Sequence, residues 1–389
     1  MNTESIGTPC LLIDRDRLST NLVAMQGKAD ANRVELRPHT KTHKSIALAR
    51  NQLELGASGI AVAKVGEAEI YAAAGITDIR IAYVTIGEEK YERIVDLMEN
   101  TRISFCVDTI EGAMGASAFF SSRDLTMEVL VEVDVGYGRC GVNWNSTEGV
   151  EFFKSVSELP GLKIIGILTH AGHSYDGPQT ETESKKEALI RVSNEERDRI
   201  LAFAFSLSEA GLIKPDNGFE ISIGSTPSLR HFENREENGF KITEIRPGNY
   251  VFNDRIQVGL DVATWQECAL TVLTTVISRH RDADGSERLF LDAGRKVFTA
   301  DLSGMMDGYG SLLYNARTME PLPHARFTRL SEEHGWVHVH GGATLSVGDR
   351  VRVVPNHACV VVNTQRNLYV VHEDEIVETW TVDAQSRVM

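Results

Sequence analysis

Between about residues 34 and 252, short apolar runs rich in β-branched residues alternate with longer amphipathic stretches. Strands that alternate with helices of about 10–15 residues indicate βα units on a parallel sheet. Eight such strands predict an α/β fold, a (β/α)8 TIM-like barrel. The predicted strands are residues 34–37, 59–63, 79–84, 103–107, 127–134, 163–169, 219–223 and 243–252. The predicted helices are residues 64–74, 88–98, 109–120, 150–158 and 184–210.

The pattern changes after about residue 263, where long helical periods vanish and the apolar runs become short and β-rich. This texture predicts a second, smaller all-β domain. We therefore expect a barrel domain over residues 15–262 and a β domain over residues 263–389, with residues 1–14 compatible with either. The predicted strands of the second domain are residues 270–278, 288–292, 336–340, 350–354, 360–362 and 368–371.

Composition narrows the class of protein. Hydrophobic residues make up 42% of the chain and charged residues 24%, as in ordinary globular proteins. The net charge of −15 argues against binding to nucleic acids or anionic membranes, which attract cationic surfaces. Five scattered cysteines suggest no disulfide framework, and no secretory signal or apolar run of about 20 residues is visible. We expect a cytoplasmic protein.

The most informative segment follows the first predicted strand and reads Arg-Pro-His-Thr-Lys-Thr-His-Lys over residues 37–44. In a (β/α)8 barrel the chemistry lies at the carboxyl ends of the strands. Lys41 stands at such an end, and a lysine there can attack a carbonyl carbon when its neighbours lower its pKa. A solvated basic loop is the alternative for this segment taken alone.

Other strand ends carry matching chemistry. Arg139 follows the fifth strand and His170 the sixth, and small-residue turns at 224–228 and 246–250 follow the seventh and eighth. The last two turns occupy the usual phosphate-binding corner of this barrel. Each piece alone also fits a plain turn, a core histidine or a solvated arginine. Their order along the strands predicts pyridoxal 5'-phosphate (PLP), held by a lysine, a stacking imidazole and a phosphate cradle.

A second pair of residues predicts a metal. His357 and Cys359 are two positions apart, so on an extended segment their side chains face the same way. An imidazole and a thiolate make half of a tetrahedral zinc site and leave two positions for water and substrate. A thiolate disfavours magnesium and calcium, which prefer oxygen ligands. Spacing alone leaves open a strand histidine beside a buried cysteine.

With these residues in view, the chain resembles the fold-type III PLP enzymes, whose barrel is that of alanine racemase. More closely, it resembles the D-serine dehydratase / D-threonine aldolase family. The ordered set of motifs is more specific than any one of them and spans nearly the whole chain. The motifs are TPCL at 8–11, RPHTKTHK at 37–44, GRCG at 138–141, LTHAG at 168–172, GSTP at 224–227, RPGNY at 246–250, DAG at 292–294, EEHG at 332–335 and PNHAC at 355–359.

The resemblance implies a role for each residue. Lys41 is the expected Schiff-base lysine, with Lys44 as its rival. Arg139 is expected at the 3'-oxygen of pyridoxal, His170 on the ring, and Arg246 at the pyridine nitrogen. An arginine there cannot accept a proton from the ring, so help from a metal would matter more. The implied phosphate-binding residues are Ser225, Thr226, Gly248 and Asn249, and Tyr175 and Tyr250 complete the cofactor-binding set.

The resemblance also implies a reaction. Dehydratases of this family carry a His-x-Cys pair that binds zinc, whereas the aldolases resemble His-x-Asp, which suits manganese or magnesium. The cysteine at 359 therefore favours a PLP- and zinc-dependent lyase that dehydrates D-serine or D-threo-3-hydroxyaspartate to a 2-oxo acid and ammonia. By analogy we expect a homodimer.

Three alternatives remain. A D-threonine-type aldolase would cleave the same D-3-hydroxy amino acids to glycine and an aldehyde. A non-catalytic PLP carrier would have no use for an open metal site. A racemase would need a tyrosine base on the second face of the cofactor, which the sequence does not place. Arg295 and Lys296 follow the DAG motif and could either bind a second substrate carboxylate or lie solvated at the surface.

Overall fold

The computed structural model describes residues 2–215, 218–340 and 345–389. The chain forms two compact units. The barrel unit comprises Met25–Lys41, Leu48–Gly248 and Arg387–Met389. The β unit comprises Met1–Ala24, Thr42–Ala47 and Asn249–Ser386. None of the helices in these described ranges is long and apolar enough to cross a membrane.

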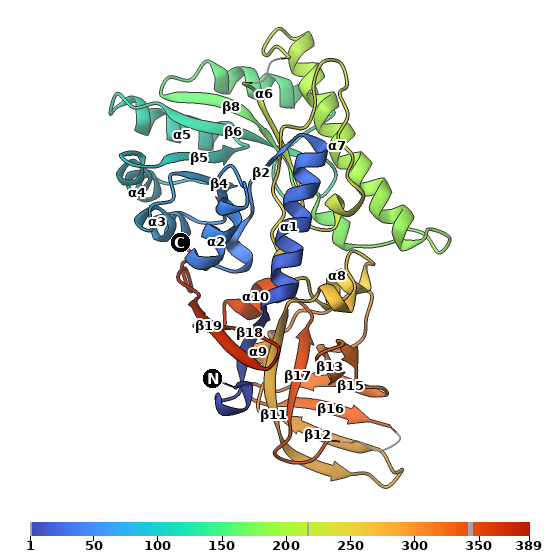
Figure 1. The fold of residues 1–389 in the computed structure, drawn as a ribbon. Helices are drawn as coiled ribbons and strands as arrows, with labels where there is room; N and C mark the ends of the chain where they lie inside the picture. The colour runs from blue at the N-terminus through green and yellow to red at the C-terminus, as the bar shows by residue number, and fades with distance from the viewer. Residues whose placement is uncertain (1, 216–217, 341–344) are drawn as a thin grey trace. The chain divides into compact units, whose positions relative to one another are not determined.

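The barrel unit is built on a parallel sheet in the order β2-β10-β9-β8-β6-β5-β4-β3. Backbone hydrogen bonds link its two end strands, from Ser58 N to Leu36 O and from Ala61 N to Pro38 O, each at 2.9 Å. The predicted (β/α)8 architecture is thereby confirmed (Figure 1). The strands are β2 (Glu35–Leu36), β3 (Ile60–Val62), β4 (Asp78–Val84), β5 (Arg102–Val107), β6 (Met127–Asp134), β8 (Leu162–Leu168), β9 (Glu220–Ile223) and β10 (Glu244–Ile245), with the short β7 (Val142–Asn143) beside β6.

Helices follow the strands at the positions that the periodicity predicts, within three residues at each end. Side-chain caps start several of them: Ser146 Oγ accepts the N–H of Gly149 at 3.0 Å, and Ser184 forms a capping box with Glu187. The predicted helices are α3 (Val65–Ala73), α4 (Glu88–Met98), α5 (Ile110–Ser121), α6 (Thr147–Ser157) and α7 (Lys185–Glu209). Two further helices, α1 (Arg15–Asn32) and α2 (Ile46–Glu54), were not predicted. In α1 few positions are buried and apolar, Leu18 and Leu22 among them, so its periodicity is weak.

The amino-terminal ends of the barrel strands are closed by buried ion pairs. The Glu244 carboxylate accepts hydrogen bonds from Arg37 and Arg80, each at 2.5 Å. Arg37 also pairs with Asp78 at 2.5 Å, and Arg80 pairs with Glu220. The Ser222 hydroxyl donates to Glu244 at 2.5 Å and accepts from Arg246, so the network is linked to one of the predicted site residues.

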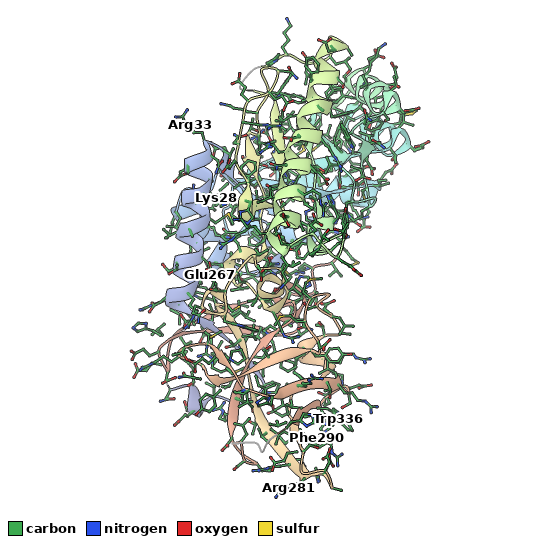
Figure 2. All side chains as sticks on the ribbon, turned by 90° about the vertical axis from the view of Figure 1, so that its right-hand side faces the viewer. Lys28, Arg33, Glu267, Arg281, Phe290 and Trp336 are labelled. Carbon is green, nitrogen blue, oxygen red and sulfur yellow. The ribbon has the colours of Figure 1, made fainter. Side chains whose placement is uncertain are left out.

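The β unit holds a mostly antiparallel sheet in the order β14-β13-β17-β11-β1-β18-β19, extended by β12, β16 and β15. The predicted all-β domain is confirmed. The strand β1 pairs with both β11 and β18, so the start of the chain belongs to this sheet. Phe290 on β12 packs edge to face on Trp336 of β16, with ring centroids 4.8 Å apart (Figure 2). The strands are β1 (Cys10–Asp14), β11 (Leu270–Arg281), β12 (Glu287–Leu291), β13 (Gly310–Asn315), β14 (Glu320–Pro321), β15 (Ala325–Leu330), β16 (Gly335–Val339), β17 (Arg350–Pro355), β18 (Asn367–His372) and β19 (Glu375–Thr381).

One predicted strand is too long and another is wrong. The predicted strand 243–252 contains only β10, followed by the 3-10 turn η5 (Asn249–Val251), because Pro247 and Gly248 interrupt the ladder. The predicted strand 360–362 is part of the short helix α10 (Ala358–Val362), although its three valines favour strands. The Asp254 carboxylate accepts the N–H of Ala358 at 2.9 Å and so caps the first residue of that helix. Shorter helices of the β unit are α8 (Arg255–Gly259) and α9 (Arg295–Phe298).

Candidate active site

Lys41 lies where the sequence predicts, in the 3-10 turn η2 (Thr40–Thr42) just after β2. The hydroxyl of Thr40 donates to the carbonyl of Ala61 at 3.1 Å, and the N–H of His39 donates to Pro247 O at 2.9 Å. These bonds attach the turn to the neighbouring strands. The lysine side chain is exposed, as a group that must meet a cofactor should be.

The barrel unit brings four predicted residues into one electrostatic cluster. Burial, followed by the charge of Lys41, lowers the pKa of His170 to about 3, and Arg139 and Arg246 act in the same direction. Burial and then Lys41 likewise hold the pKa of His39 well below its usual range. The carboxyl ends of β2, β6, β8 and β10 therefore converge as expected. His39 joins the set although its role was not predicted.

His170 is held in a defined orientation. Its Nδ1 lies 3.1 Å from the carbonyl oxygen of Gly224. A carbonyl can only accept, so in the neutral ring Nδ1 carries the proton and Nε2 does not. The ring of Tyr137 meets His170 edge-on, with centroids 6.1 Å apart and an interplanar angle of 86°. A Cβ at Gly172 would collide with the Tyr137 ring, which explains the glycine in the THAGH segment.

The guanidinium groups of Arg139 and Arg246 differ in how far they are exposed. Arg139 is half exposed and lies 3.6 Å from the carboxylate of Glu132, with its guanidinium 5.5 Å from the Tyr137 ring centroid. Arg246 is 4% exposed and donates to Thr169 O at 2.6 Å and to the Ser222 hydroxyl. Burial lowers the pKa of Arg246 to about 10, and the Glu244 carboxylate opposes this shift. Arg246 is held by buried hydrogen bonds, whereas Arg139 is half exposed beside Glu132.

The turn after β9 is rich in hydroxyl groups. Ser225 and Thr226 are buried, and the Ser225 hydroxyl lies 2.8 Å from that of Ser174 and 3.0 Å from that of Ser228. Gly224 has φ +132°, and a Cβ there would approach the backbone N of Arg246 to 2.9 Å. Only glycine allows these two turns to lie so close. Hydroxyls and backbone N–H groups at this corner fit the phosphate of PLP.

The remaining predicted cofactor residues are divided between the two units. Tyr175 ends the 3-10 turn η3 (Gly172–Tyr175), and Gly248 ends the segment Leu48–Gly248 of the barrel unit. Both residues are half-buried. Asn249 and Tyr250 are buried in the β unit. The amide oxygen of Asn249 is buried with no hydrogen-bond partner, which fits a group that awaits a ligand.

The predicted metal pair lies wholly within the β unit. The Cys359 sulfur is 3.1 Å from the hydroxyl of Thr42 and 3.7 Å from Nδ2 of Asn249. Burial alone would raise the pKa of Cys359, but His357 and Thr42 outweigh it and lower that pKa. Burial likewise opposes the charged form of His357, yet Cys359 raises its pKa to about 9. The two groups stabilise each other as thiolate and imidazolium, and a divalent cation bound to both would displace the imidazolium proton.

Two carboxylates lie near the pair. Asp254 is fully buried and accepts from Asn249 at 2.5 Å, from the N–H of Gln257 at 3.0 Å and from Ala358, so its oxygens are used by the protein. Asp301 is 3.7 Å from Nδ1 of His357. Within the described ranges no group of three metal-binding side chains occurs. His357 and Cys359 would therefore supply two ligands to a metal, one fewer than the three protein ligands of typical catalytic zinc sites.

The cations after the DAG motif are surface residues. Lys296 Nζ is 2.6 Å from Glu333 and 3.4 Å from Glu332, and all three side chains are exposed. Arg295 is exposed as well. The solvated alternative therefore describes Lys296 better than a substrate-binding role.

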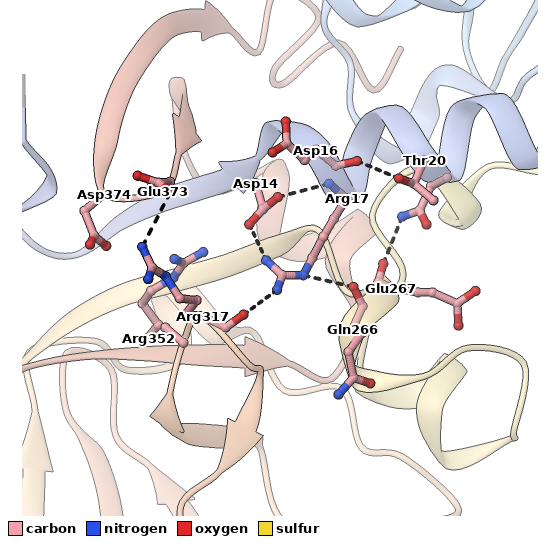
Figure 3. Close-up of a pocket in the computed structure, with 12 residues that line it drawn as sticks. Asp14, Asp16, Arg17, Thr20, Gln266, Glu267, Arg317, Arg352, Glu373 and Asp374 are labelled. Atoms are coloured by element: carbon pink, nitrogen blue, oxygen red, sulfur yellow. Dashed lines mark hydrogen bonds and ion pairs between the residues drawn. The ribbon is translucent and has the colours of Figure 1, made fainter.

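The β unit also contains a polar cavity of about 440 Å³ that includes none of the predicted residues (Figure 3). Two ion pairs join charged groups of its lining, Arg17 with Asp14 and Arg317 with Glu373. Arg17 donates to Asp14, to Gln266 O at 2.9 Å and to Arg317 O at 2.8 Å. We do not assign chemistry to it, because its size alone carries none.

Some site residues were not predicted. Thr42 is part of the quoted motif, but only the fold shows that its hydroxyl contacts Cys359. Tyr137 adjoins the GRCG motif, and its contact with His170 depends on the loop after β6. Asp254 and Glu196 are single carboxylates in unremarkable segments, so no sequence signal marks them.

Known protein families and relatives match most of the chain. Residues 13–255 match the family "Alanine racemase, N-terminal domain", and residues 269–371 match "Putative serine dehydratase domain". D-threo-3-hydroxyaspartate dehydratase of Delftia sp. (strain HT23) is 32% identical, over 97% of this chain and 97% of its own. D-threonine aldolase of Arthrobacter sp is 32% identical, over 98% of this chain and 93% of its own.

The solved structure of the Delftia enzyme superimposes with a TM-score of 0.86 and 31% identity, covering 98% of each chain. Two single variants of D-threo-3-hydroxyaspartate dehydratase have also been solved. In one a histidine is changed to alanine, and in the other a cysteine two positions further on, the latter in a metal-free form. The two matched families account for the barrel and for the β domain, and the relatives match nearly the whole chain. The chain therefore belongs to the fold-type III PLP family that includes these D-amino-acid dehydratases and aldolases.

Proposed function

We propose that the protein dehydrates a D-3-hydroxy amino acid, D-threo-3-hydroxyaspartate or D-serine, to a 2-oxo acid and ammonia. The observation that carries this proposal is the Cys359 thiolate beside His357, since family resemblance associates His-x-Cys with dehydration. A D-threo-3-hydroxyaspartate dehydratase and a D-threonine aldolase are equally similar in sequence at 32%, so overall identity does not decide between the reactions.

The residues of the barrel unit would bind and orient PLP, which supplies an electron sink for the bond broken at Cα. Lys41 would hold the cofactor covalently and then, as a neutral amine, take the α-proton. His170, neutral and protonated at Nδ1, would present a flat uncharged face to the ring. Ser225 and Thr226 would hold the phosphate.

His357 and Cys359 would hold a divalent metal, for which we propose zinc because a thiolate is a soft ligand. The metal would make the substrate's 3-hydroxyl a better leaving group. For this role the pair has to face the 3-hydroxyl of a substrate bound at Lys41. Asn249 and Thr42 would orient the sulfur through the contacts described above.

The test is a product assay on the purified protein loaded with PLP and zinc. D-threo-3-hydroxyaspartate and D-serine are each supplied, and ammonia, 2-oxo acid, glycine and aldehyde are measured. Ammonia and a 2-oxo acid as the main products support the proposal. Glycine and an aldehyde would support the aldolase alternative instead, and neither pair of products would favour a PLP carrier.

We further propose a homodimer, a cytoplasmic location and a domain boundary near residue 262. The five cysteines are all free, which supports a reducing compartment. Sedimentation at micromolar concentration tests the dimer, and cell fractionation tests the location. Limited proteolysis tests the boundary.

A further inference from the structure

The carboxylate of Glu196 is fully buried on α7 and takes no part in the chemistry proposed above. Its Oε1 accepts the backbone N–H groups of Ala171 and Gly224, each at 3.0 Å. Its Oε2 accepts the hydroxyl of Ser228 at 2.6 Å. One side chain thus ties the loop after β8 to the turn after β9.

Both of these segments carry residues assigned to PLP. Ala171 directly follows His170, and Gly224 directly precedes Ser225. Gly224 is held on both sides, because its N–H donates to Glu196 while its carbonyl accepts from His170 Nδ1 at 3.1 Å. The position of the imidazole and the position of the phosphate turn are therefore linked through a single acceptor.

Stability alone does not call for a carboxylate at this place. Burying a charged group costs desolvation free energy, which hydrogen bonds have to offset. Burial raises the pKa of Glu196, and the bonds from Ser228, Ala171 and Gly224 oppose that shift. Val192 and Ile200, four positions before and after Glu196 on α7, are buried and apolar. An acceptor is needed where two buried N–H groups must be held at fixed positions.

We propose that Glu196 is a positioning residue, which fixes the His170 loop and the Ser225 turn in one register so that ring and phosphate of PLP are bound together. This inference rests on the proposed binding of PLP at these two loops. Glu196 itself would not touch the cofactor.

Three variants of Glu196 test separately its role as a hydrogen-bond acceptor, its charge and the length of its side chain. Glu196→Met keeps the length of the side chain but accepts no hydrogen bond. Glu196→Gln can accept both N–H groups at Oε1 and donate to Ser228 from Nε2. Glu196→Asp keeps the charge but is one methylene too short. Glu209→Met, at the exposed end of the same helix, is the matched control.

The first measurement is equilibrium titration of the cofactor-free protein with PLP, followed by absorbance. Glu196→Met is expected to weaken PLP binding about tenfold or more, because two buried N–H groups lose their acceptor and the two loops are no longer held in register for the cofactor. Glu196→Asp should behave similarly. Glu196→Gln and the control should bind PLP within about threefold of the unaltered protein. If Glu196 acted through its charge, Glu196→Gln would not restore binding in this way.

The second measurement needs no cofactor. Amide hydrogen exchange at Ala171 and Gly224 should accelerate about tenfold or more in Glu196→Met and Glu196→Asp, and not in Glu196→Gln. If the methionine variant does not fold, the aspartate variant decides. Unchanged PLP affinity and unchanged exchange in the variant that folds would overturn the inference. If the unaltered protein does not bind PLP, the proposed function fails, whereas the exchange rates still decide whether Glu196 holds the two loops.

Discussion

The hydroxyl oxygen of Thr42 lies 3.1 Å from the sulfur of Cys359, across 317 positions of the chain. Thr42 is also the residue that directly follows Lys41. Thr42 and Cys359 both belong to the β unit, so this contact lies within one compact unit. Together with His357, this hydroxyl opposes the effect of burial and lowers the pKa of the thiol. In the proposed metal site, Thr42 would act as an outer partner of Cys359.

We expect Thr42→Val to weaken metal binding by about 10- to 100-fold, the usual effect of removing such an outer partner. Valine keeps the shape of the side chain and removes only the hydroxyl. Thr42→Ser, which keeps the hydroxyl, should bind zinc nearly as well as the unaltered protein. Competition with a chromogenic chelator measures both affinities. Equal affinity for all three proteins would show that the contact does not tune the ligand.

Lys41 rather than Lys44 should carry the cofactor. Reduction with borohydride followed by peptide mapping is expected to place the label on Lys41, which is exposed in η2. Lys44 is 6% exposed and has a left-handed backbone with φ 50°, and its carbonyl accepts the N–H of Ala384 at 3.0 Å. A label on Lys44 or Lys64 would overturn the assignment of Lys41.

His170→Ala should weaken PLP retention, because one stacked face of the ring is lost. A stacked aromatic pair contributes about 0.5–1.5 kcal/mol beyond burial, which corresponds to a roughly two- to tenfold higher dissociation constant. His338→Ala on β16 is a control of the same chemistry in the β unit. If cofactor affinity and activity are unchanged in His170→Ala, the histidine belongs to the core alone.

The barrel and the order of its strand ends could be predicted because each depends on local pattern. Periodicity in α4 and β6 fixes their bounds to the residue. Long-range contacts could not be predicted in the same way. Three valines at 360–362 favour a strand, yet a carboxylate from residue 254 caps a helix there. The same limit hid the contact of Thr42 with Cys359 and the three bonds of Glu196, since nothing near these residues in sequence marks their partners.

The buried Glu244 should matter for stability and its dependence on pH. Burial opposes the charged form, but Arg80 and Arg37 outweigh it and lower the pKa of Glu244 to about 2. This folded-state pKa lies below the ordinary value, so the stabilisation is complete above about pH 4.5 and is lost as the pH falls toward 2. Glu244→Gln should cost about 3–5 kcal/mol at pH 7, because Arg37 and Arg80 are left uncompensated.

Urea denaturation at pH 7 and at pH 4 measures this effect. The control is Glu128→Gln, whose partner Arg102 is 45% exposed, and its expected cost is under about 1 kcal/mol. A Glu244→Gln variant as stable as the Glu128→Gln variant would show that the ion pairs at the amino end of the barrel contribute little.

Removal of the metal should stop the reaction and leave the cofactor bound. Chelation is expected to abolish dehydration while the visible absorbance of lysine-bound PLP persists, because the metal acts on the 3-hydroxyl and Lys41 holds the cofactor. Zinc should restore activity. Full activity after exhaustive chelation would exclude the Lewis-acid role of a metal at His357 and Cys359.

Cys359→Asp tests the identity of the ligand more sharply. The change replaces a soft sulfur by a hard oxygen, so the metal preference should shift from zinc toward manganese. The ratio of glycine to 2-oxo acid among the products should rise, since the resemblance links a His-x-Asp pair to the aldolases. Cys268→Asp is not a suitable control because Cys268 is buried, whereas the exposed Cys140 allows Cys140→Asp with no expected change in metal preference. An unchanged metal preference in Cys359→Asp would place the metal on other residues and remove the basis for favouring dehydration over cleavage.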